Sequence, residues 1–212
     1  MLEIDLQGEL ITLLPQRALY WAKESTLIVA DMHWGKTGHF RKNGIAIPSI
    51  TQDTDEQILS DLIHTYKADR LIVAGDMFHS KPNKETDSFS HWRNQHQALA
   101  IDLVNGNHDI LPRDSYTNWN ITLHDEVLNI APFTIAHDEI DTPQGFLLHG
   151  HIHPALKIPL KGRTTVRTDC FCISEKSLLL PALGKFTGRH TINQKDYKQL
   201  YIITGDNIIK WK

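Results

Sequence analysis

Residues 26–33 read TLIVADMH, and this stretch indicates how the chain is built. Five residues that favour a buried strand stop abruptly at Asp31, and His33 follows two positions later. Four other short runs repeat the arrangement, each a strand candidate that ends beside a residue type able to bind a metal ion. They lie at residues 71–74, 101–104, 133–136 and 145–148, and the polar residues after them are Asp76, Asn107, His137, and His151 with His153.

The segments between the early strands have helical periodicity. Residues 51–67 place Ile58, Leu62 and Tyr66 on one stripe at i, i+4 spacing, and a weaker pattern predicts a second helix over residues 90–100. The second half instead predicts strands at residues 169–173, 177–180, 200–203 and 207–211, the last two joined by a tight hairpin. The chain thus begins as βαβ units and ends as mostly β, which predicts an α/β sandwich built on two packed sheets.

Composition and charge narrow the class of protein. The chain has 212 residues, of which 41% are hydrophobic and 22% charged, which predicts a single domain over residues 1–212. Its apolar runs are far shorter than a membrane span, and acidic residues near the start argue against a secretory signal, so we expect a cytoplasmic protein without membrane contact. A formal charge of −3 disfavours extensive wrapping of DNA but leaves room for a local basic patch.

The residues at the strand ends form a set of metal-ligand types. Because the carboxyl ends of neighbouring strands lie along one edge of an α/β fold, we expect these residues to converge in one pocket. The set contains carboxylates, imidazoles and one amide, with no thiolate, which suits Mn²⁺, Fe²⁺ or Zn²⁺, and two ions if one carboxylate bridges them. Each motif alone is weak, whereas their joint occurrence at successive strand ends is specific.

In these motifs the chain resembles the calcineurin-like metallophosphoesterase superfamily, whose pattern is D-x-H, G-D, G-N-H-D/E, an isolated His and G-H-x-H. The corresponding residues are Asp31-Met32-His33, Gly75-Asp76, Gly106-Asn107-His108-Asp109, His137, and Gly150-His151-Ile152-His153. Within the superfamily it is most similar to the bacterial ligase-associated DNA-damage-response endonucleases or phosphoesterases, on stretches that include DMHWGK, GDMFHS, GHIHP and LPALG. This resemblance implies a four-layer α-β-β-α sandwich with two packed mixed sheets.

The resemblance also implies residue roles. One metal ion would be bound by Asp31, His33 and His153, the second by Asn107, His137 and His151, with Asp76 as the bridge. Two divalent ions, Mn²⁺ ahead of Fe²⁺, Zn²⁺ or Mg²⁺, would share a hydroxide that attacks phosphorus. His108 would protonate the leaving oxygen or stabilise the charge that develops on it, and Asp109 would accept a hydrogen bond from His108 and orient its ring.

Four further residues have two interpretations that the sequence leaves open. His149 shares the strand parity of the two histidines after it, so it is either a rival ligand or a residue that packs nearby. His79 lies either beside the metal ligands or at the surface. Lys36 and Arg41 follow the first metal motif in a loop, where they either contact substrate phosphates or are solvated charges.

The motifs predict a two-metal phosphoesterase that hydrolyses phosphodiester bonds. The subgroup adds the expectation of a DNA endonuclease linked to DNA repair, with DNA as substrate and DNA-repair proteins as partners. The alternative is a phosphodiesterase or phosphomonoesterase that acts on a small nucleotide or another phosphorylated metabolite. A non-catalytic scaffold on the same fold would be expected to have lost ligands or His108, and this sequence retains them all.

Overall fold

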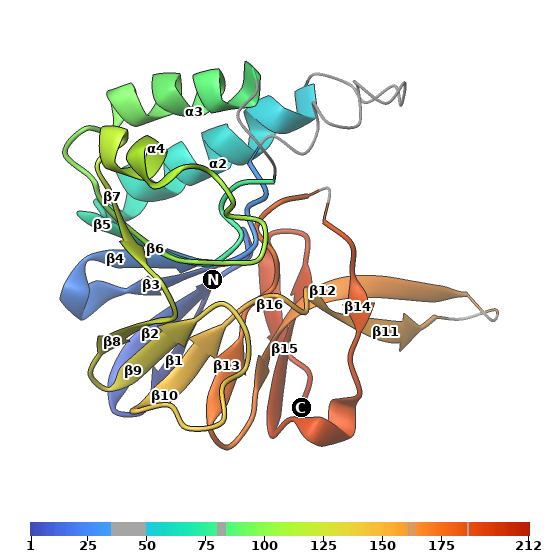
Figure 1. Ribbon diagram of the computed structural model, residues 1–212. Coiled ribbons are helices and arrows are strands. Elements are labelled where there is room, and N and C mark those ends of the chain that lie inside the picture. Colours follow the sequence, from blue (N-terminus) through green and yellow to red (C-terminus); the bar gives the residue numbers. More distant parts are fainter. Residues whose placement is uncertain (35–49, 80–83, 161, 163, 186) are drawn as a thin grey trace.

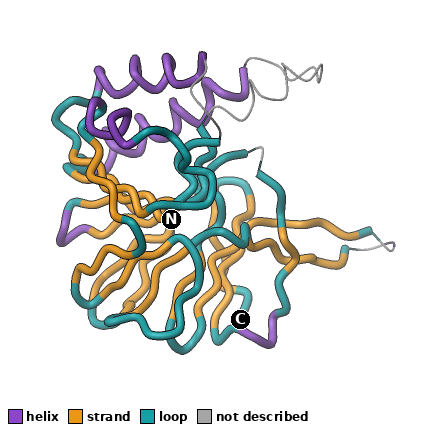
Figure 2. The backbone as a smooth tube through the Cα atoms, viewed as in Figure 1, coloured by secondary structure: helices purple, strands orange, loops and turns teal. Residues whose placement is uncertain are grey.

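Two β-sheets pack face to face, and α-helices cover the outer face of one of them (Figures 1 and 2). The computed structural model describes residues 1–34, 50–79, 84–160, 162, 164–185 and 187–212. The arrangement confirms the predicted α/β class with two packed mixed sheets. None of the helices in these residues is both long and apolar enough to cross a bilayer.

The first sheet combines an antiparallel half with a parallel half. Its strand order is β1 (Leu2–Leu6), β2 (Glu9–Leu14), β3 (Ala18–Trp21), β4 (Thr26–Val29), β5 (Arg70–Ala74), β6 (Ala100–Val104) and β7 (Ile121–His124). Strands β1 to β4 pair antiparallel, and β4 to β7 pair parallel. Parallel neighbours need crossover connections, and these contain α2 (Ile50–Tyr66), α3 (Lys84–Gln95) and α4 (Arg113–Asn118). The carboxyl ends of β4, β5 and β6 therefore lie side by side.

The second sheet is also mixed. Its order is β14 (His190–Thr191), β11 (Pro154–Pro159), β12 (Thr165–Ile173), β13 (Ser177–Leu179), β10 (Phe146–His149), β9 (Phe133–Ala136) and β8 (Val127–Ile130), with the hairpin of β15 (Gln199–Thr204) and β16 (Asn207–Lys210) paired to β12. Strands β9 and β10 are parallel, as are β10 and β13. This brings the carboxyl ends of β9 and β10 together at the same edge.

Side-chain alternation explains how the layers hold together. Along β4, Leu27 and Val29 face the helices, whereas Ile28 faces the second sheet, so the strand is buried on both sides and reads as a continuous apolar run. Between the sheets, Trp21 and Phe133 meet edge to face with their ring centroids 4.9 Å apart. Aromatic pairs of this kind add to the apolar burial that stabilises the sandwich.

Two parts of the helical and strand prediction need correction. The second helix spans Lys84–Gln95 instead of residues 90–100, because the Arg93 guanidinium donates hydrogen bonds to the carbonyls of His96 and Leu99 and so fixes a turn before β6. The chain also does not begin with a βαβ unit, since the antiparallel strands β1 to β3 precede β4. The alternating exposure of β1, in the sequence LEIDL, was a readable signal for the first of them.

The fourth layer implied by the family resemblance is not found among the residues that the structure describes. The outer face of the second sheet carries Cys170 and Cys172, which are both buried and form no disulfide. They belong to an apolar cluster with Ile192, and Tyr197 packs against it. These two residues flank the short 3-10 helix Gln194–Asp196, and this segment covers the face where an α-helix was expected.

Candidate metal centre and active site

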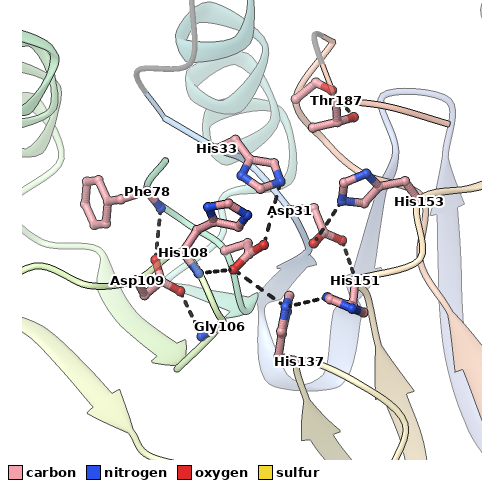
Figure 3. Close-up of polar contacts among 12 residues, drawn as sticks. Asp31, His33, Phe78, Gly106, His108, Asp109, His137, His151, His153 and Thr187 are labelled. Atoms are coloured by element: carbon pink, nitrogen blue, oxygen red, sulfur yellow. Dashed lines mark hydrogen bonds and ion pairs between the residues drawn. The ribbon is translucent and has the colours of Figure 1, made fainter. Parts of the chain in front are cut away.

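Six of the seven predicted metal ligands converge at the edge where strand ends of both sheets meet (Figure 3). Those from the first sheet follow β4 or β5, and those from the second follow β9 or β10. They are, in chain order, Asp31, His33, Asp76, His137, His151 and His153. The seventh, Asn107, follows β6 and lines a cavity together with His137.

The backbone at this edge is held in an uncommon conformation. Asp31, His33, Asp76, His151 and His153 all have positive φ, with values of 51°, 47°, 53°, 70° and 53°. Non-glycine residues rarely occupy this region, which costs on the order of 1–3 kcal/mol each, and such residues gather at functional sites. Backbone hydrogen bonds across the two loops, from Asp31 N–H to the Gly75 carbonyl (3.1 Å) and from His33 N–H to the Asp76 carbonyl (2.9 Å), hold the turns together.

Two motif glycines let the ligands of opposite sheets approach. Gly75 has φ +78°, and a Cβ there would lie 2.1 Å from Nδ1 of His137. A Cβ at Gly150 would lie 2.4 Å from Oδ2 of Asp31. Both distances are far inside van der Waals contact, so any side chain at these positions would displace a candidate ligand.

One group of candidate ligands, which we call the inner cluster, consists of Asp31, His33 and His153. Asp31 is fully buried, and in the described structure its Oδ1 accepts no hydrogen bond but lies 3.2 Å from Nε2 of His153. His153 donates from Nδ1 to the carbonyl of Gly188 (3.0 Å), which turns Nε2 toward the carboxylate. A buried carboxylate needs a positive partner, and this donor set fits a divalent cation.

A second group, the outer cluster, consists of Asp76, His137 and His151. His137 donates from Nδ1 to the Ala74 carbonyl (3.3 Å), which leaves Nε2 facing Nδ1 of His151 at 3.0 Å. A backbone carbonyl on one ring nitrogen is the usual way in which a metal-binding histidine is oriented. The side chain of His151 is 38% exposed, so this cluster opens to solvent.

Asp76 lies between the clusters and faces both. Its Oδ2 lies 3.7 Å from Nε2 of His33, and its Oδ1 lies 3.6 Å from Nε2 of His137. One carboxylate with an oxygen toward each histidine is the arrangement expected of a bridging ligand between two cations. The donor atoms are oxygen and imidazole nitrogen, a set that suits divalent ions.

Comparison with solved structures shows which known proteins the chain is similar to. The chain is similar to the nuclease MPE of Pseudomonas putida, with 31% sequence identity and a TM-score of 0.82 over 95% of this chain and 96% of that one. The chain belongs to the calcineurin-like metallophosphoesterase superfamily. It also matches Yfce, a phosphoesterase from E. coli, at 11% identity and a TM-score of 0.44 over 86% and 90% of the two chains. A scan against protein-family models and a search of curated proteins gave no match.

In this metallophosphoesterase, His108 lies beside the clusters and close to His79. The two rings stack with centroids 5.3 Å apart at an interplanar angle of 21°, and the His33 ring lies 5.1 Å from that of His108. Nitrogen atoms of the three rings are close enough to form a third group of potential ligands. The sequence left open whether His79 lies beside the metal ligands or at the surface. The structure places it beside them.

Asp109 does not orient His108, and that expectation needs correction. Its Oδ1 accepts a hydrogen bond from the Phe78 N–H and its Oδ2 one from the Gly106 N–H, each 3.0 Å long (Figure 3). Burial raises the pKa of Asp109 to about 7, against the lowering effect of these donors. The side chain thus ties the loop after β5 to the loop after β6 and holds the backbone on which His108 is mounted.

Of the remaining candidates, the structure describes His149 but not Lys36 or Arg41. His149 is buried and belongs to neither cluster, and burial lowers its pKa to about 4, so it is neutral near pH 7. Lys36 and Arg41 lie outside the described residues. Asp138, which the sequence analysis did not single out, lies 3.8 Å from Nε2 of His151. It follows His137 directly, and that adjacency was the available signal.

A cavity of about 510 Å³ adjoins the outer cluster and includes Asn107 and His137 in its wall. We call it the acidic cavity, because its charged lining consists of Glu126, Asp138 and Asp141. Among the residues described, neither lysine nor arginine lines it. A strongly anionic group would be repelled from this side of the metal centre.

Proposed function

We propose that this metallophosphoesterase is a metal-dependent phosphodiesterase that cleaves nucleic acid. The observation that carries the proposal is the position of Asp76, with one oxygen toward the inner cluster and one toward the outer cluster. Two cations held there would neutralise charge on the phosphoryl oxygens and activate a water for attack on phosphorus. The similarity to the P. putida nuclease supports nucleic acid as the substrate class.

The protein's own groups would supply orientation and a proton. His108 is exposed beside the clusters, and its backbone N–H donates to Oδ1 of Asp76 (2.8 Å), which fixes its distance from the bridging carboxylate. We assign its imidazolium the role of proton donor to the leaving oxygen, a role that imidazole fills near neutral pH. His79, stacked on it, would restrict the orientation of the ring.

The charge of the surroundings favours a diester over a monoester. A phosphomonoester is a dianion near neutral pH and would need cationic side chains beyond the metal ions. The acidic cavity offers carboxylates instead, and amide side chains such as Asn129 and Gln144. A diester carries one negative charge per phosphate. The uncharged parts of the groups attached to that phosphate could lie against the carboxylates and amides of the cavity wall without charge repulsion.

Finer parts of the proposal follow the sequence expectations. We propose Mn²⁺ as the native ion, because the oxygen and imidazole donors without thiolate suit it. We further propose that the chain acts as one domain in the cytoplasm and takes part in DNA repair with other repair proteins.

A substrate panel tests the proposal. The protein, stripped of metal with a chelator, would be assayed with Mn²⁺, Mg²⁺ or Zn²⁺ on a chromogenic diester, the matching monoester, and single-stranded and duplex DNA. We expect turnover of the diester and of DNA that requires added metal and is highest with Mn²⁺. A clear preference for the monoester would overturn the nuclease assignment, and activity that persists in chelator would overturn the metal mechanism.

A further inference from the structure

Two basic residues lie directly opposite each other on the hairpin that projects from the second sheet (Figure 1). In the antiparallel pairing of β11 with β12, Lys157 is in register with Arg167, and both side chains are exposed. Like charges directly opposite in an antiparallel pair are destabilising. Within the part of the chain that the structure describes, neither side chain forms an ion pair, so their repulsion is not offset there.

Strand parity shows which way this pair faces. Alternate residues of a strand share a face, so Arg167 lies on the same face of β12 as Asp169 and Phe171. Phe171 packs in the core between the sheets, and Asp169 contacts Arg17, which lies in the turn between β2 and β3 of the first sheet. The pair therefore lies on the face of the hairpin that continues from the inner side of the sandwich, where the metal ligands gather.

A second basic group lies between this pair and the metal centre. Asp169 accepts hydrogen bonds from Nε and Nη2 of Arg189 (2.5 and 2.9 Å) and from Nη1 of Arg17 (3.4 Å). Two guanidinium groups share one carboxylate, so the group retains one positive charge, and the Arg189 side chain is 47% exposed. Gly188, its neighbour in the chain, contacts the inner cluster directly, because its carbonyl accepts a hydrogen bond from His153.

The spacing matches a polymer and exceeds a small substrate. From His153 to Lys157 the chain advances four residues along β11, about 13 Å at roughly 3.3 Å per residue. Phosphates of one stacked strand rise about 3.4 Å per nucleotide, so the distance corresponds to about four nucleotides. The acidic cavity adjoins the outer cluster through His137, whereas the hairpin continues from His153 of the inner cluster. A polyanion with one phosphate at the metal ions would be attracted along the hairpin and repelled from the cavity side.

We infer that the face formed by Arg189, Lys157 and Arg167, which we call the basic hairpin face, binds the phosphate backbone of the nucleic-acid substrate on one side of the scissile phosphate. The inference rests on the proposed function and adds to it the path of the strand. It also accounts for the like-charge pair, because backbone phosphates would supply the counter-charge that the fold does not. A substrate too short to reach the hairpin would gain nothing from this face.

The test compares a double variant, K157Q/R167Q, with the single variant K176E. Each lowers the formal charge by two, and Lys176 is exposed in the turn at the opposite end of β12. Substrates are a single-stranded oligonucleotide of about 12 nucleotides and a chromogenic diester, both with Mn²⁺. We expect K157Q/R167Q to lower the ratio of kcat/KM for the oligonucleotide to kcat/KM for the chromogenic diester by about tenfold. The slope of log kcat/KM for the oligonucleotide against log salt, which is negative, should become shallower by about 1.4, or 0.7 for each lost phosphate contact.

The outcomes separate this inference from the proposed function. An unchanged ratio and an unchanged salt slope in K157Q/R167Q would overturn the inference, as would an equal effect in K176E, which would indicate net charge alone. Failure of the wild-type protein to cleave either diester would overturn the proposed function instead. Thermal unfolding provides a check on folding, because removal of the like-charge repulsion should leave the Tm of K157Q/R167Q no lower than that of the wild type.

Discussion

The inner and outer clusters use the same kinds of ligand in different surroundings. In the inner cluster the side chains of Asp31, His33 and His153 are 0%, 3% and 17% exposed. In the outer cluster those of Asp76 and His137 are 3% and 7% exposed, but that of His151 is 38% exposed and next to Asp138. Among the described members of the two clusters, His137 of the outer cluster lines the acidic cavity. One site is thus enclosed by protein and the other faces solvent.

This contrast suggests that the two metal sites have different roles. A cation in an enclosed site is held strongly by the buried carboxylate, because a buried carboxylate without a compensating positive charge costs free energy. A cation in an open site exchanges more readily with solvent and leaves room for a phosphate group. Four predictions would break or sharpen the comparison, from the largest expected effect to the smallest.

Asp76→Asn should affect both clusters, because Asp76 faces both. We expect it to remove at least half of the bound metal and to lower kcat/KM by more than about 10⁴-fold, since several kcal/mol of transition-state charge stabilisation would be lost. Metal content by atomic emission and kcat/KM on the chromogenic diester measure the two effects. Asp138→Asn is the matched control, being the same change at a 55% exposed carboxylate, and should lower kcat/KM by less than about tenfold. A full metal complement in D76N would contradict the bridge.

His108→Asn should separate ligands from catalysts. His108 lies outside both clusters, so metal content should stay near that of the wild type, whereas kcat should fall by roughly 10²–10⁴-fold through loss of the proton donor. The deficit should be smaller for a good leaving group, such as nitrophenolate, than for the sugar hydroxyl of DNA. Metal loss in this variant would make His108 a ligand, and an equal deficit on both substrates would favour charge stabilisation over proton transfer.

A pair of histidine variants compares the two sites directly. Mn²⁺ at about 100 times the Kd of the inner site should raise the free energy of unfolding by about 2.7 kcal/mol. His151→Asn should keep most of this stabilisation, because it alters the open site. His153→Asn should lose it, because it removes the partner of the buried Asp31 carboxylate. Differential scanning calorimetry with and without Mn²⁺ provides the measurement, and equal losses in the two variants would erase the distinction between the sites.

The smallest expected effect concerns Asp109 and pH. Burial raises its pKa in the folded protein to about 7 from the ordinary 3.8, so its contribution to stability is fully present below about pH 3.8 and is lost as pH rises through 7. Between pH 5 and 7 the metal-free wild type should lose about 2 kcal/mol relative to Asp109→Asn, which cannot titrate. Urea unfolding at several pH values measures this difference, and a pH-independent difference would show that Asp109 does not titrate in this range.

Much of the fold was predictable from local chemistry. Apolar runs that stop at polar residues, such as residues 26–30 before Asp31, define strands whose ends share one edge, and the observed β4, β5, β6, β9 and β10 follow them closely. The stripe of Ile58, Leu62 and Tyr66 predicted α2 because its periodicity is local. The end of α3 was not predictable in this way, because it depends on contacts of Arg93 with residues outside the helix.

The sequence by itself determined which residues are able to bind metal, because ligand type and order are written in the motifs. Only the tertiary structure decided how they are used. The division into an enclosed and an open cluster depends on which side chains of the two sheets cover one another, and the orientation of Asp109 depends on backbone donors in the loops after β5 and β6. The opposition of Lys157 and Arg167 follows from the register of β11 on β12. Each of these relations depends on which segments the fold places beside one another, and packing fixes them because a side chain's neighbours across a sheet or between sheets are not its neighbours in sequence.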